Sequence, residues 1–238
     1  GGTMLKLENI TYKVDDKLIL DNISLEIDER FVAITGPNGS GKSTLAKIIA
    51  GIIPATSGKI YLDGEDITDM SITDRAKAGI SFAFQQPVRF KGITVMDLIS
   101  LASGKKLSVT EACNYLSEVG LCARDYIKRE VDGSLSGGEL KRIEIAMINA
   151  RGTKLSVFDE PEAGIDLWSF QNLIKVFEKM YEKNKGSILI ISHQERILDI
   201  ADKILVLRAG KIDKIGTKEE IMPSLLGIDK GCRYIKED

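Results

Sequence analysis

The feature that most restricts the fold is a glycine-rich segment, Gly36-Pro37-Asn38-Gly39-Ser40-Gly41-Lys42-Ser43-Thr44. The apolar residues 31–34 lie directly before it. After it, Leu45, Ile48, Ile49 and Ile52 recur at the spacing of one helical face. This order predicts a buried strand, a tight loop and a helix, the unit from which α/β folds are built.

The segment fits the pattern G-x-x-x-x-G-K-[ST] of a phosphate-binding loop, in the strand-to-helix setting that this loop requires. Its glycines let successive N–H groups and the helix N-terminus face phosphate oxygens. We expect Lys42 to reach the β- and γ-phosphates of a nucleotide and Ser43 to ligate Mg²⁺. A glycine turn without function is the alternative, and the flanking strand and helix disfavour it.

The rest of the chain alternates between strand and helix patterns. With 238 residues and 43% hydrophobic content, it predicts one domain with a small insertion. Residues 4–27 alternate as an antiparallel sheet does, 155–158 and 187–191 are apolar strands, and 204–215 suggest a hairpin. We predict an α/β fold with a mainly parallel sheet core (4–86 and 135–238), an antiparallel β subdomain and an inserted helical subdomain (about 87–134).

Two sets of apolar residues are assigned to buried helix faces. In the helical subdomain, Leu98 and Leu101 are expected in its own core. A long helix later in the chain is expected to bury one shared face, made of Leu167, Phe170, Leu173, Ile174, Phe177 and Met180.

Composition disfavours several partners. Lys+Arg 33 nearly balance Asp+Glu 35, so there is no basic surplus for nucleic acid. No apolar run approaches the roughly 18 residues of a membrane span, and no secretory signal is visible, so we expect a cytoplasmic protein without membrane insertion. Residues 1–3 are expected to be a tag remnant. Cys113, Cys122 and Cys232 form no paired ligand motif and are most simply reduced thiols; a role with metal or sulfur stays open.

A second chemical signal is the pair of acids that follows the apolar strand at residues 155–158. Ligands of open α/β sheets bind at the carboxyl ends of the strands. We expect Asp159 to hold Mg²⁺ through water and Glu160 to act as general base on the attacking water. The alternative is that both acids only begin a loop.

The segment Leu135-Ser136-Gly137-Gly138-Glu139 opens a predicted helix and resembles the signature sequence of the ATP-binding-cassette (ABC) ATPases. An isolated Ser-Gly-Gly would more often be a helix cap. The resemblance extends over residues 4–215 and implies an enzyme that hydrolyses ATP with Mg²⁺. It also implies a head-to-tail homodimer, in which the signature of one chain completes the nucleotide site of the other.

The remaining motifs match that family position by position. Tyr12 matches the aromatic that stacks on adenine, although sheet packing is as good an explanation. Gln85 matches a glutamine that touches Mg²⁺ or the water, and Asp166 lies in a loop that crosses the dimer interface and is also a plausible helix cap. His193, the only histidine, matches the switch histidine at the γ-phosphate; a lone histidine is otherwise usually incidental.

The resemblance thus implies three overlapping sets of residues. The catalytic set is Glu160, His193, Lys42 and Gln85, and the magnesium set is Ser43, Gln85 and Asp159. The ATP-binding set is Tyr12, Gly36, Asn38, Gly39, Ser40, Gly41, Lys42, Ser43, Thr44, Ser136, Gly137, Gly138 and Asp166.

Four patches resemble the ATPase subunit of the SUF iron–sulfur cluster assembly scaffold: residues 83–88, 141–144, 164–166 and 193–199. The last, His193-Gln194-Glu195-Arg196-Ile197-Leu198-Asp199, is the most telling. Two departures are the short segment 90–134 and Pro161-Glu162 after Glu160. The resemblance implies docking of a scaffold subunit on the helical subdomain. The alternatives are the ATPase of a membrane transporter and a nucleotide switch without catalysis.

Overall fold

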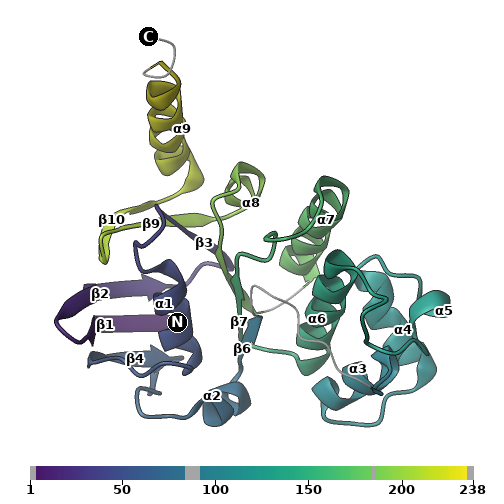
Figure 1. Ribbon diagram of the computed structural model, residues 1–238. Coiled ribbons are helices and arrows are strands. Elements are labelled where there is room, and N and C mark those ends of the chain that lie inside the picture. The colour runs from purple at the N-terminus through teal and green to yellow at the C-terminus, as the bar shows by residue number, and fades with distance from the viewer. Residues whose placement is uncertain (1–3, 84–91, 184–185, 235–238) are drawn as a thin grey trace. The chain divides into compact units, whose positions relative to one another are not determined.

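The computed structural model describes residues 4–83, 92–183 and 186–234. The chain divides into two compact units. Unit 1 comprises residues 1–75 and 189–238, and unit 2 comprises residues 76–188. In Figure 1, unit 1 takes the purple and blue start and the yellow end of the colour scale, and unit 2 the teal and green middle.

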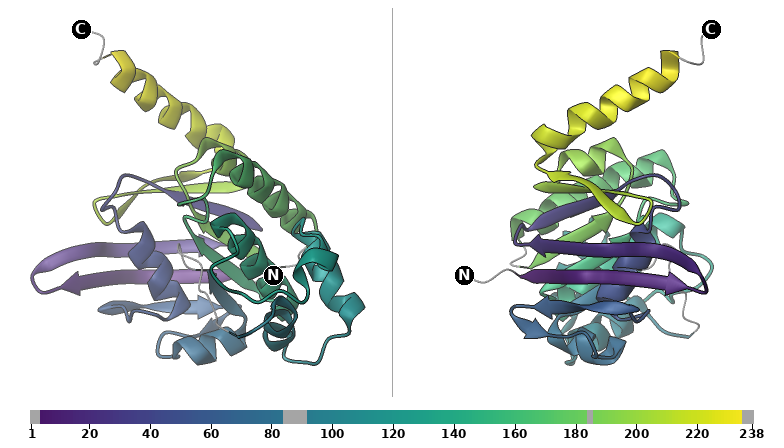
Figure 2. Two further views of the ribbon diagram at one scale, coloured as in Figure 1. Left: turned by 45° about the vertical axis from the view of Figure 1, so that its right-hand side comes forward. Right: turned by 90° about the vertical axis from the view of Figure 1, so that its left-hand side faces the viewer.

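Unit 1 contains an antiparallel sheet with strand order β2-β1-β4-β5. Its strands are β1 (Leu5–Val14), β2 (Lys17–Ile27), β4 (Ser57–Leu62) and β5 (Glu65–Asp66). Leu5 and Leu7 are buried, while Lys6 and Glu8 are partly exposed, as expected for a sheet with one packed face. The right-hand view of Figure 2 shows β1 and β2 side by side.

Unit 1 also carries the strands around the glycine loop. The five residues of β3 (Phe31–Thr35) are all buried, and β3 pairs in parallel with β9 (Lys203–Arg208). β9 turns into β10 (Lys211–Gly216) as an antiparallel hairpin. α1 (Lys42–Ala50) follows the loop, and α8 (Glu195–Asp199) and α9 (Lys218–Tyr234) belong to the C-terminal part.

Arg75 anchors the segment before unit 2. It lies in α2 (Ile72–Ala78), is 3% exposed, and is the buried residue of that short helix. Its guanidinium donates to the carbonyls of Ile48 and Ile49 at 2.6 and 3.0 Å and to that of Thr68 at 2.9 Å. A cation at the carbonyl end of α1 is favourable, since the last carbonyls of a helix lack partners of their own.

Unit 2 pairs β6 (Ile80–Ala83) in parallel with β7 (Leu155–Asp159). Its helices are α3 (Val95–Ser103), α4 (Val109–Glu118), α5 (Ala123–Tyr126), α6 (Gly137–Arg151) and α7 (Leu167–Lys183). Helices α3, α4 and α7 all contact α6. β8 (Ser187–Ile191) spans the boundary between the units.

The predicted α/β fold is confirmed, with parallel strand pairs beside an antiparallel sheet. Two predicted core positions are wrong. Leu101 is 75% exposed because, at 100° per residue, it leaves the face that Val95, Leu98 and Ile99 bury in α3. Leu167 is 71% exposed because it is the first residue of α7, before the buried face made by residues such as Phe170 and Leu173 begins. The boundaries of the helical subdomain stay a prediction.

In the described part of the chain, no helix combines the length and the apolar character needed to span a membrane.

Candidate functional site

The glycine loop begins where β3 ends, and its first residue must be glycine because there is no room for a side chain. Gly36 has φ +143°, and a Cβ added there would lie 2.1 Å from the carbonyl oxygen of Leu207. No side chain fits at that distance from a neighbouring strand. The chain can therefore turn closely past β9 only with glycine at this position.

Lys42 and the start of α1 give the loop its capacity to hold an anion. Lys42 is 7% exposed, and its ammonium donates to the carbonyl of Gly36 and, at 3.4 Å, to that of Pro37. α1 starts without a side-chain cap and without an acid in its first turn. Ser40 Oγ is buried and has no hydrogen-bond partner among the described residues. Uncapped N–H groups, a cation and a spare hydroxyl fit a polyphosphate.

His193 lies beside this loop within unit 1. The N–H of Ser192 donates to the carbonyl of Ile34 at 3.1 Å, which holds the end of β8 against β3. His193 follows, and it lines a cavity of about 360 Å³ together with Gly36 and Pro37. We call this space the loop-side cavity. Its other lining residues are the polar Thr35, the charged Glu195 and Arg208, and five apolar residues, Leu198, Val206, Met222, Leu225 and Leu226.

Tyr12 lies one strand away from the loop. It is half-buried in β1 and pairs with Leu20 of β2. Leu20 in turn packs against the loop, since a Cβ added at Gly41 would lie 2.6 Å from its Cδ2. This placement keeps both predictions for Tyr12 open, stacking on adenine and packing in the sheet.

Unit 2 contains the two acids at the end of β7. Asp159 is its last residue and is 6% exposed. Glu160 has φ +44°. For a residue other than glycine, this left-handed conformation costs on the order of 1 kcal/mol, and residues strained in this way are concentrated at functional sites. The N–H of Ala163 closes the following turn on the carbonyl of Glu160 at 3.0 Å.

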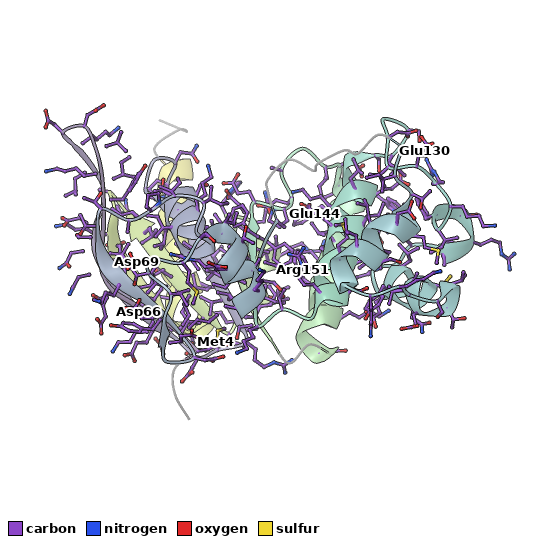
Figure 3. All side chains as sticks on the ribbon, turned by 90° about the horizontal axis from the view of Figure 1, so that it is seen from below. Met4, Asp66, Asp69, Glu130, Glu144 and Arg151 are labelled. Atoms are coloured by element: carbon purple, nitrogen blue, oxygen red, sulfur yellow. The ribbon has the colours of Figure 1, made fainter. Side chains whose placement is uncertain are left out.

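A buried lysine interacts electrostatically with the first of these acids, Asp159. Lys141 of α6 is 2% exposed, and burial lowers its pKa, opposed by the charges of Glu144, Asp159 and Glu162. Its ammonium lies 3.9 Å from Glu144 Oε2, and burial raises the pKa of Glu144 to about 7. Figure 3 labels Glu144 on the same helix as Arg151. In the sequence, Lys141 was noted only as part of a family resemblance. The spacing of three residues between Lys141 and Glu144 was the available signal for this buried pair.

The predicted signature turn begins α6 in the same unit. Ser136 Oγ accepts the N–H of Glu139, and Glu139 Oε1 accepts the N–H of Ser136, both at 3.1 Å. This capping box leaves the N–H groups of Gly137 and Gly138 to other partners. A Cβ added at Gly138 would lie 2.8 Å from Ser169 Cβ, so the turn is in close contact with α7.

Asp166 caps α7, as predicted from its position. Its Oδ1 accepts the N–H of Ser169 at 2.8 Å. The hydrogen bonds from the backbone N–H and the hydroxyl of Ser169 lower the pKa of Asp166. The segment 163–166 also borders the signature turn, since a Cβ at Gly137 would lie 3.8 Å from Ile165 Cγ2.

The structure therefore groups the predicted site residues in two sets. In unit 1 the loop, Lys42 and His193 lie together, with Tyr12 nearby. In unit 2 the signature turn lies beside Asp166, and Lys141 links α6 electrostatically to Asp159. Gln85 lies outside the described residues. Cys113 is half-buried and Cys122 exposed, and both are free thiols.

Comparison with known proteins identifies the family. The model of the ABC transporter family matches residues 20–163. An uncharacterised ABC transporter ATP-binding protein of Methanocaldococcus jannaschii is 39% identical over 92% of this chain and 90% of its own. A probable ATP-dependent transporter, ycf16, of Antithamnion sp. is 32% identical over 92% of this chain and 93% of its own.

A solved structure adds the nucleotide. It is the dimeric post-hydrolysis state of an ATP-binding cassette bound to ADP and phosphate. It is 27% identical, covers 90% of this chain and 98% of its own, and superposes with a TM-score of 0.78. The chain therefore belongs to the ABC transporter family, as an ATP-binding subunit that hydrolyses ATP with Mg²⁺.

Proposed function

We propose that this ATPase drives conformational change in a SUF-type scaffold for iron–sulfur cluster assembly. The observation that carries the proposal is the segment His193–Asp199, which resembles the His-x-x-Arg-Ile-Leu-Asp of the SUF ATPase subunit. In this segment, Ile197 and Leu198 are buried at 0% and 4% exposure, and His193 lines the loop-side cavity. The resemblance thus covers core and site positions together. The proposal implies a cytoplasmic protein.

A second patch supports the same assignment. Lys141, Arg142 and Ile143 are all buried, and Lys141 is paired with Glu144. A buried lysine requires nearby carboxylates, because an isolated buried charge costs several kcal/mol. The four residues therefore act as one structural unit, which makes a chance resemblance in this patch less plausible. Residues 84–88 of another patch lie outside the described part of the chain.

For the reaction, we propose the roles that the motifs imply. Lys42 binds the β- and γ-phosphates, and Ser43 ligates Mg²⁺, with Asp159 acting through water. Glu160 is the general base, and His193 and Gln85 orient the water at the γ-phosphate. Positioning and charge neutralisation supply most of the rate enhancement in such transfers.

We further propose that two copies close head to tail around two nucleotides. The triphosphate held by the glycine loop of one copy is then sealed by the Ser136 turn of its twin. Two observations support this. α6 presents the N–H groups of Gly137 and Gly138 at its start, a favourable end for an anion. The similar cassette with bound ADP and phosphate is a dimer.

The second candidate is the ATPase subunit of a membrane transporter. The names of the two relatives favour it, since both are called transporter proteins. In that case the helical subdomain would bind a permease instead of a scaffold. The catalytic parts would be the same in both cases.

Purification of the chain from its native host, with bound partners identified by mass spectrometry, tests the proposal. We expect a partner without membrane spans and without nucleotide motifs. A partner with several membrane spans would refute the SUF role and establish the transporter. Single-turnover ATP hydrolysis with and without Glu160→Gln tests the chemistry separately, and an undiminished rate in the variant would refute the assigned base.

A further inference from the structure

Leu167 and Trp168 form an exposed apolar pair at the start of α7. They are 71% and 67% exposed, and Trp168 is the only tryptophan of the chain. α7 buries a different face, with Phe170, Leu173 and Phe177 at 9%, 1% and 0% exposure. Leaving a large aromatic side chain exposed forgoes the favourable free energy of burying it. Since the pair is not needed to hold α7 in place, a binding role is the better explanation.

The pair borders the signature turn. α6 precedes β7 in the chain and α7 follows it. A helix connected directly to a strand in this way runs antiparallel to the strand, so α6 and α7 run parallel to each other. Their starts are in contact, since a Cβ at Gly138 would meet Ser169 at 2.8 Å. Leu167 and Trp168 directly precede Ser169 in the chain, so their backbone is near the turn that begins at Ser136.

The loop-side cavity of unit 1 has the complementary character. It holds about 360 Å³, within the roughly 300–1,000 Å³ range of pockets that bind small molecules. Leu198, Val206, Met222 and Leu225 form the apolar part of its lining, Glu195 and Arg208 are its charged members, and Pro37 places it directly at the glycine loop. The cavity is thus next to the phosphate-binding loop, as the exposed pair is next to the signature turn.

We propose that, in the ATP-bound dimer, the Leu167–Trp168 pair of each copy inserts into the loop-side cavity of its twin. This inference rests on the proposed head-to-tail dimer. That dimer sets the Ser136 turn of one copy opposite the glycine loop of the other, so the neighbours of these two features also face each other. The exposed apolar pair of each copy then meets the apolar part of the twin's cavity, so the contact occurs twice, once on each side of the two-fold axis.

The insertion gives the dimer an anchor that ATP alone does not provide. Aromatic side chains that fill a pocket at the centre of an interface commonly dominate its binding free energy. The anchor also lies at His193 of the twin, which lines the same cavity. Closure of the dimer and placement of His193 at the γ-phosphate would therefore occur together.

Fluorescence of Trp168 tests the inference directly, because no other tryptophan contributes. The Glu160→Gln chain is mixed with Mg²⁺ and ATP at high concentration, and light scattering measures the dimer in the same sample. We expect the emission to move to shorter wavelength and acrylamide quenching to fall as the dimer forms. ADP at the same concentration, which lacks the γ-phosphate that the twin's turn would contact, is expected to produce neither change.

Variants test both sides of the contact. Trp168→Ala in the Glu160→Gln background is expected to weaken the dimer by about tenfold or more, as for a pocket-filling anchor. Trp168→Phe should restore part of the affinity. Leu225→Arg, which fills the cavity, should weaken the dimer similarly. Leu101→Ala is the matched control: Leu101 is 75% exposed, but it is in α3 and not in the contact.

Cysteine cross-linking supplies geometry. Copies carrying Trp168→Cys are mixed with copies carrying Leu225→Cys, after replacement of the native cysteines by serine. We expect a disulfide between copies only with ATP, and none when Leu101→Cys replaces Trp168→Cys. A dimer that forms while Trp168 stays open to acrylamide overturns the inference and leaves the head-to-tail dimer intact. Absence of any ATP-dependent dimer overturns both.

Discussion

Gly138 allows α6 and α7 to approach, and its replacement by alanine tests how closely they pack. A Cβ at this position would lie 2.8 Å from both Cβ and Oγ of Ser169. Ser169 cannot easily move, because it is 7% exposed and its N–H and hydroxyl are bound to Asp166 at 2.8 and 3.1 Å. Glycine to alanine in a helix normally stabilises by up to about 1 kcal/mol. Overpacking of this kind costs about 1–3 kcal/mol.

We therefore expect Gly138→Ala to lower the free energy of unfolding by about 1–2 kcal/mol, the overpacking cost less the gain in helix propensity. For a chain of this size that corresponds to a fall in Tm of about 2–8 °C. Urea unfolding followed by circular dichroism, without nucleotide, measures it. Gly137→Ala is the control, since its Cβ would find neighbours only at 3.8 and 3.9 Å and should be neutral or slightly stabilising.

A double-mutant cycle with Ser169→Gly assigns the cause. If the clash with Ser169 is responsible, Gly138→Ala should be much less harmful in the Ser169→Gly chain, with a coupling of about 1 kcal/mol or more. Equal stability of Gly138→Ala and the parent chain would refute the close packing of α6 on α7. Equal damage from Gly137→Ala would place the effect in the helix start itself and not in this contact.

Three further predictions concern a buried acid, a buried cation and the loop. Burial raises the pKa of Glu144 from 4.5 to about 7, so between these pH values the folded state binds more protons than the unfolded state. The stability contributed by this group therefore falls as the pH rises from about 4.5 through about 7. Glu144→Gln should remove that fall, at most about 3 kcal/mol, in urea titrations across this window; an unchanged pH profile would contradict it. Arg75→Ala should cost about 3 kcal/mol or more, because the carbonyl of Ile48 loses its donor at 2.6 Å, and Arg75→Lys should recover only part of this in the same assay. Gly36→Ala, with its Cβ 2.1 Å from the carbonyl of Leu207, should weaken ATP binding at least about tenfold by calorimetry, and unaltered affinity in a folded variant would refute the loop geometry.

The strands were predictable because alternation and apolar runs are local signals. β1, β2, β3 and the β9–β10 hairpin lie where the pattern places them. α2 was not predicted, because its buried residue is Arg75, and no apolar repeat marks a helix that is anchored by a cation. α9 was also missed; it contains Pro223, which normally argues against a helix interior.

For the candidate site, the motifs predicted which residues matter, but not which lie in contact. The match to known patterns located Ser136, Asp166 and Asp159. That the signature turn touches α7 through Gly138 and Ser169 depends on how two helices pack, which a single sequence does not encode locally. The burial of Lys141 is of the same kind, since its charge alone suggests an exposed side chain.

The helices differ in whether a side chain caps their first N–H groups. α3, α4 and α6 begin with complete capping boxes, at Thr94, Ser108 and Ser136, so each satisfies two of its first N–H groups, those of the cap residue and of the third helical residue, from its own sequence. α1 begins at Gly41 without a side-chain cap. α5 and α8 also begin without a side-chain cap, but α1 is the longest of these three helices and is the one that follows the glycine loop. We propose that the phosphates of ATP bind the first N–H groups of α1, so that nucleotide binding adds to the local stability of this helix.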